Sequence, residues 1–174
     1  MPRIIILLLL SMAASIGLAS DIPFERGPVI EAFGPVAIGE TSLPLSPESR
    51  FKIAFDVASA AKDKSHSRQL ESAARLLNLH AKLGIPQDRT EIAIVVHGAA
   101  ALDLTKDQRY GRKNPSADLI AALIDAGVTI QLCGQTAAYR DIEIADLLPG
   151  IEVLPSAMTA HALLQQDGFT LNPF

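Results

Sequence analysis

The chain has 174 residues, of which 49% are hydrophobic and 20% are charged. This is the size and composition of one globular domain, which excludes wholesale disorder. The formal net charge is −4, so we expect neither nucleic acid nor an anionic membrane as a partner, because both select basic surfaces. One cysteine cannot form a disulfide within the chain, so the fold depends on its hydrophobic core.

Residues 1–19 have the pattern of a secretory signal peptide. Arg3 supplies a positive charge, residues 4–10 are an apolar run, and Gly17 and Ala19 are small residues suited to signal peptidase. We expect cleavage after Ala19, a periplasmic or otherwise secreted protein, and no stable membrane insertion afterwards. Losing one arginine and no acid changes the net charge from −4 to −5. The alternative, an uncleaved anchor, is disfavoured because the apolar run is short and diluted by serine and glycine.

Residues 20–50 have a different character from the rest of the chain. They contain five of the eleven prolines and three glycines, and they show no sustained periodicity. This pattern predicts an extended Pro/Gly-rich arm, because proline blocks both helix and central strand. Apolar residues such as Phe24, Ile30 and Phe33 are expected to pack on the domain or on a neighbouring subunit.

From residue 51 to 174 the sequence alternates between predicted strands and predicted helices. Residues 51–57 alternate apolar and polar side chains, whereas residues 91–97 form an almost continuous apolar run typical of a central parallel strand. The pattern predicts one α/β domain with three α/β/α layers and a mostly parallel sheet of about five strands. The expected strands are 51–57, 91–97, 128–133, 151–154 and 169–171; the expected helices are 67–83, 99–104, 115–126, 135–148 and 156–166.

Several chemically active residues lie at the carboxyl ends of these predicted strands. Ligands of open parallel sheets bind outside these ends. Because consecutive strands are usually neighbours, His97 and Cys133 are expected at the same edge of the sheet. The residues predicted at this edge are Asp56, His97, Gly98, Cys133, Gly134 and Ser156.

Cys133 is the strongest candidate for a reactive group. It ends a strand, and Gly134 and Gln135 open the next helix, where unpaired N–H groups favour a thiolate. Lowering a thiol pKa from about 8.5 to about 7 requires about 2 kcal/mol, which is the most that a helix terminus supplies. Further activation would need a cation such as a protonated His97. The alternative is a buried, inert cysteine.

The remaining polar residues have structural alternatives. Asn114 is either a helix cap or a ligand contact, and His97 is either a site residue or a structural histidine. His80 is expected in the core or at an interface, and His161 on a helix surface. H-E-x-x-H and C-x-x-C motifs are absent, and we predict neither metal nor cofactor. A Cys–His–acid hydrolase with Asp56 as third member has no supporting motif.

Several short motifs together resemble the DsrE/DsrF-like superfamily, and more narrowly its exported branch. They are V-V-H-G-A-A at 95–100, N-P at 114–115, C-G-Q at 133–135, L-P-S-A-M-T at 154–159 and G-P at 34–35. The resemblance implies a three-layer fold and assembly into homotrimers or homohexamers. It also implies that Cys133 carries a persulfide in a pocket lined by His97, Asn114, Gln135 and Ser156. Ser116 departs from the branch, which often has asparagine there.

Two functions follow as hypotheses. The first is an exported persulfide-based sulfur carrier or sulfurtransferase-like relay protein, in which Cys133 attacks a persulfide, polysulfide or thiosulfate-like donor. His97 would hold or move a proton, and Gly98 and Gly134 would line the pocket with the residues above. The second is a non-catalytic oligomeric module that binds a small anion or metabolite and has a structural Cys133.

Overall fold

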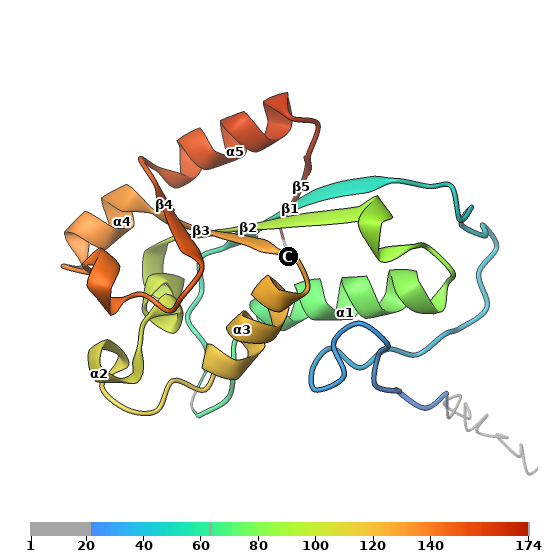
Figure 1. Ribbon diagram of the computed structural model, residues 1–174, viewed down its shortest axis with the longest axis horizontal. Helices are drawn as coiled ribbons and strands as arrows, with labels where there is room; N and C mark the ends of the chain where they lie inside the picture. Colours follow the sequence, from blue (N-terminus) through green and yellow to red (C-terminus); the bar gives the residue numbers. More distant parts are fainter. Residues whose placement is uncertain (1–21, 63, 174) are drawn as a thin grey trace, which may run out of the picture.

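A five-stranded parallel sheet forms the centre of the computed structural model, which describes residues 22–62 and 64–173 (Figure 1). The predicted signal peptide lies outside the described residues. The strand order is β4-β3-β2-β1-β5, and every neighbouring pair is parallel. The strands are β1 Phe51–Val57, β2 Thr90–Val96, β3 Thr129–Cys133, β4 Ile151–Leu154 and β5 Thr170–Asn172.

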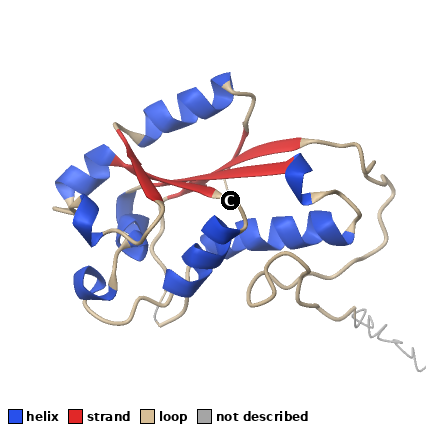
Figure 2. Ribbon diagram, viewed as in Figure 1, coloured by secondary structure: helices blue, strands red, loops and turns tan. Residues whose placement is uncertain are grey.

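Helices cover both faces of the sheet, which confirms the predicted three-layer α/β/α architecture. Figures 1 and 2 show α1 and α3 on one side of the sheet and α5 on the other. The α-helices are α1 Arg68–Lys82, α2 Asp107–Tyr110, α3 Ala117–Asp125, α4 Gly134–Tyr139 and α5 Ala157–Gln166; the 3₁₀ helices are η1 Gln87–Arg89, η2 Gly98–Leu104 and η3 Ile144–Asp146.

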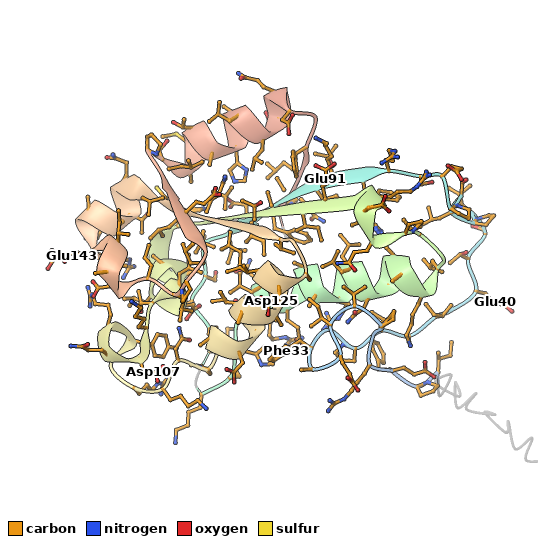
Figure 3. All side chains as sticks on the ribbon, viewed as in Figure 1. Phe33, Glu40, Glu91, Asp107, Asp125 and Glu143 are labelled. Carbon is orange, nitrogen blue, oxygen red and sulfur yellow. The ribbon has the colours of Figure 1, made fainter. Side chains whose placement is uncertain are left out.

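The two faces of the sheet carry side chains of different size. Phe55, Ile94 and Ile130 belong to the main hydrophobic core, together with the apolar residues of α1 and α3. The alternating positions point the other way and include the buried alanines Ala54 and Ala93. These short side chains allow α5 to pack close to the sheet, and side chains fill the space on both faces (Figure 3).

The helix predicted over residues 135–148 is shorter in the structure. The α-helix ends at Tyr139, and Asp141 adopts a left-handed φ of 52° that an α-helix cannot continue through. The chain turns there and places Ile142 in the core, where its side chain is 8% exposed. A 3₁₀ helix, η3, follows instead of further α-helix. The apolar spacing of this segment therefore reflects a buried turn as well as a helix face.

The arm preceding β1 is attached to α1 by the buried side chain of Asn78. Its Oδ1 accepts hydrogen bonds from the backbone N–H of Val29 and Ile30, and its Nδ2 donates to the carbonyl oxygens of Ile30, Phe33 and Gly34. One amide thus satisfies five backbone groups of a segment without regular structure. None of the helices described in residues 22–62 and 64–173 is long and apolar enough to cross a membrane.

Candidate functional site

The parallel register brings three chemically active side chains to one edge of the sheet. Val57 pairs with Val96, and Val96 pairs with Leu132, so the next residues, His97 and Cys133, leave neighbouring strands side by side. Asp56 precedes Val57 on the adjacent strand. Because side chains alternate between faces, Asp56, His97 and Cys133 all lie on the α5 face. The predicted convergence of His97 and Cys133 at the carboxyl edge is observed.

A cavity of about 300 Å³ opens at this edge. Strands β1, β2 and β3 supply its floor, and the first turns of α4 and α5 supply its walls. Its accessible surface is mostly apolar. The lining residues are Asp56, His97, Cys133, Gln135, Thr136, Ser156, Ala157, Met158 and His161.

Cys133 lies at the inner end of this cavity and is 6% exposed. Burial raises the pKa of its thiol and is the largest single influence. The opposing influences prevail and hold the pKa below its ordinary value: a hydrogen bond from the Thr136 hydroxyl, and others from the backbone N–H groups of Thr136, Ala157 and Gln135. Two of these N–H groups open α4, whereas Ala157 opens α5. The sulfur therefore faces two helix N-termini, of which the sequence indicated one.

Thr136 links the sulfur to the β2 edge of the site. Its hydroxyl accepts a hydrogen bond from the backbone N–H of Gly98 at 3.2 Å, so its own hydrogen is free to point at Cys133. Gly98 adopts a left-handed φ of 57°, and an added Cβ would lie 3.3 Å from the carbonyl oxygen of Ala58. Gly98 thus acts through its backbone and does not line the cavity.

Asp56 joins two imidazoles beside the cysteine. Its carboxylate accepts from His97 Nε2 at 3.2 Å and from His161 Nε2 at 2.8 Å. Desolvation raises the pKa of Asp56 and is the largest influence, but the two histidine hydrogen bonds prevail and lower the pKa below its usual value. Each imidazole therefore has its Nε2 directed at the carboxylate. The Nδ1 of His161 is buried and has no partner in the described structure.

The prediction that His161 lies on the outer surface of its helix is wrong. Its side chain points down from α5 to the sheet and is 16% exposed. The inward face of α5 contains Ala157, the fully buried Ala160 and His161, a three-to-four residue spacing that marks a helix stripe. This spacing was the available signal, but apolar residues occur on more than one side of α5 and conceal which face is buried.

The prediction that Asn114 lines the pocket of Cys133 is also wrong. Asn114 is 1% exposed, and its Nδ2 donates to the carbonyl oxygens of Asp103 and Thr105 at 2.8 and 2.7 Å. Its Oδ1 accepts from the backbone N–H of Ser116 at 2.9 Å, which makes the turn that starts α3. Asn114 is therefore a structural residue of the turn before α3, whose N-cap is Ser116 rather than Asn114.

The other predicted residues lie at the rim or behind it. Gln135 and Ser156 line the cavity; the Oγ of Ser156 accepts from the backbone N–H of Thr159 at 3.0 Å and caps α5. Gly134 is not a lining residue. A Cβ on Gly134 would lie 2.7 Å from the carbonyl oxygen of Leu154. Glycine therefore permits the β3–α4 turn to lie close to the β4–α5 turn. This close approach brings the N-termini of α4 and α5 to the sulfur of Cys133.

The site contains a nucleophile, proton donors and acceptors, and anion-stabilising N–H groups. A thiolate beside such donors can attack electrophilic sulfur, and carboxylate–imidazole pairs can move protons. Among the described residues, no group of three or more His, Cys, Asp or Glu side chains has an arrangement that could hold a metal ion.

Comparisons with known proteins agree with this architecture. Residues 46–173 match the profile of the DsrE/DsrF-like family, and the chain belongs to this family. The fold resembles a protein of unknown function, MTH1491, from Methanobacterium thermoautotrophicum (22% identity, TM-score 0.55) and the ychN protein from E. coli (17% identity, TM-score 0.55). Each likeness covers 71% of this chain and 99% of the other. None of the curated proteins matches the chain.

Proposed function

Starting from membership of the DsrE/DsrF-like family, we propose that the protein is an exported sulfur carrier that holds sulfane sulfur as a persulfide on Cys133. The observation that carries the proposal is the cavity that Cys133 shares with His97 and His161 at the starts of α4 and α5, where nearby hydroxyl and N–H donors lower the pKa of the thiol despite burial. A sulfur carrier needs a thiolate near neutral pH, because the thiolate is the nucleophile. A purely structural buried cysteine gains nothing from this arrangement.

The loading step is a thiol–persulfide exchange without change in the total oxidation state. The Cys133 thiolate attacks the outer sulfur of a donor R–S–SH, an S–S bond forms to Cys133, and the donor S–S bond breaks. The electron pair of the broken bond leaves on R–S⁻. The outer sulfur keeps its hydrogen, and Cys133 becomes Cys–S–SH. Unloading to an acceptor thiolate is the reverse exchange.

His97 and His161 are proposed to serve the leaving thiolate. Both line the cavity with Cys133, and both are oriented by Asp56 through their Nε2 atoms. Because Nε2 of each ring is hydrogen-bonded to Asp56, the ring acts through Nδ1, which donates a proton to R–S⁻ as it departs and recovers one when the acceptor enters. Asp56 is a positioning residue that fixes both rings.

Export and self-assembly are part of the same proposal. The signal-peptide pattern of residues 1–19 supports a periplasmic or secreted carrier, and the family resemblance supports a homotrimer or homohexamer. Exposed apolar side chains on the arm, such as Phe24 at 69% and Leu43 at 78% exposure, are suited to contacts between subunits.

Mass spectrometry of the folded protein after incubation with inorganic polysulfide tests the proposal. Because the chain has one cysteine, addition of one sulfur to the intact protein reports Cys133, and Cys133→Ser is the matched control. We expect uptake by the wild type and slower uptake by His161→Gln. If a small reference thiol takes up sulfur and the folded protein does not, the carrier function is refuted. An ordinary thiol pKa in the same protein would then favour the binding module.

A further inference from the structure

The cavity restricts which sulfur donors reach Cys133. The cavity measures about 300 Å³, and 94% of the cysteine is covered. The rim contains Met158, which is 81% exposed, and the exposed Gln135; Ala157 lies beside Met158. A thioether and a methyl group form a soft, apolar wall that suits a short sulfur chain. The entering molecule must therefore be small and narrow.

The charges that face the cavity disfavour a doubly charged donor. The titratable groups in its lining are Asp56, His97, His161 and Cys133, and no lysine or arginine is among the described lining residues. The imidazoles on β2 and α5 direct Nε2 at Asp56 rather than at the cavity. A dianion would approach both a carboxylate and a thiolate without a permanent cation to offset its charge.

The hydrogen-bond donors of the site are already engaged. The N–H groups of Gln135, Thr136 and Ala157 lie close to the Cys133 sulfur and lower the pKa of its thiol. At the rim, the Gln135 amide donates to the carbonyl oxygen of Pro155 at 3.4 Å, and the Ser156 hydroxyl is paired with Thr159. A sulfonate group presents three strong acceptor oxygens, which would lose their hydration here without gaining an equivalent set of donors.

From these observations, and on the basis of the carrier function proposed above, we propose that the donor is a low-molecular-weight hydropersulfide or a short, singly charged hydropolysulfide and that the cavity excludes the doubly charged thiosulfate. With hydrogen disulfide the reaction is Cys–S⁻ + HS–SH → Cys–S–SH + HS⁻. The corresponding thiosulfate reaction, Cys–S⁻ + S–SO₃²⁻ → Cys–S–S⁻ + SO₃²⁻, brings a dianion into the cavity and releases another.

The test compares, near neutral pH, the rates at which intact protein acquires sulfur from short-chain inorganic polysulfide, which is then mostly singly charged, and from thiosulfate at equal sulfane sulfur. Thiosulfate is the less reactive donor for any thiol, so each rate is divided by that of the same protein unfolded in urea. We expect the folded state to lower the normalised thiosulfate rate by at least about tenfold relative to polysulfide. Met158→Lys adds a cation at the exposed rim and is expected to raise the normalised thiosulfate rate relative to the normalised polysulfide rate. The neutral Met158→Gln is not expected to raise it.

The outcomes separate this inference from the proposal on which it rests. The donor assignment would be overturned, and persulfide transfer left standing, if the two donors had equal normalised rates. The same would follow if Met158→Lys and Met158→Gln changed the normalised thiosulfate rate alike. Absence of sulfur uptake from every donor would overturn both.

Discussion

Replacing Thr136 by valine tests whether the hydrogen bonds to Cys133 control its reactivity. Valine keeps the shape of the side chain but removes the hydroxyl that donates to the sulfur. A hydrogen bond to a charged group is worth about 1.5–3 kcal/mol, and one pKa unit corresponds to about 1.4 kcal/mol. We therefore expect the pKa of Cys133 to rise by about one to two pH units. The rate of alkylation at neutral pH should fall by about tenfold or more because less thiolate is present.

The assay is the pH dependence of iodoacetamide alkylation of the folded protein, which reports Cys133 alone because it is the only cysteine in the sequence. Valine also leaves the Gly98 N–H without its acceptor, so unfolding in urea is measured in parallel. Thr136→Ser keeps the hydroxyl and is the matched control, with a pKa close to the wild-type value. If the folded valine variant has the same thiol pKa as the wild type, the proposed role of this hydrogen bond is incorrect.

Three further substitutions test the scaffold of the site. Asn78→Ala removes the five hydrogen bonds that hold the arm and should lower the free energy of unfolding in urea by about 3 kcal/mol or more. The control Ser72→Ala, at a partly exposed position of the same helix, should change it by less than about 0.5 kcal/mol, and equal effects would contradict this account. Gly134→Ala forces a Cβ against the carbonyl oxygen of Leu154, which should lower the free energy of unfolding by about 1–3 kcal/mol and slow alkylation of Cys133. The control Gly39→Ala adds a Cβ where there is space for it and should change neither quantity. Burial raises the pKa of Asp103. The stability that its protonated form contributes is therefore present below the unfolded pKa of about 3.9 and is lost as pH rises through the folded pKa. Thermal unfolding should show Asp103→Asn gaining stability relative to the wild type from about pH 4 upwards, and a pH-independent difference between the two proteins would refute this.

The sequence by itself predicted the alternation of elements and one edge of the site. Period-two and period-3.6 patterns are local, so β1, β2 and α1 were recognisable from their own residues. The rule that parallel strands place ligands at their carboxyl ends then located His97 and Cys133 together. The segment after α4 was harder to predict, because the buried turn at Ile142 uses the same apolar residues as a continuing helix would.

The tertiary structure decided how these residues act. Asp56 and His161 are separated by 105 positions in the chain, and their contact arises because α5 crosses over the face of the sheet opposite α1 and α3. The same crossing brings the N–H of Ala157 to a sulfur that already faces the start of α4. No local pattern contains this information, because the pKa of a thiol depends on every dipole near it in space, and chain connectivity alone leaves open which face of the sheet α5 covers.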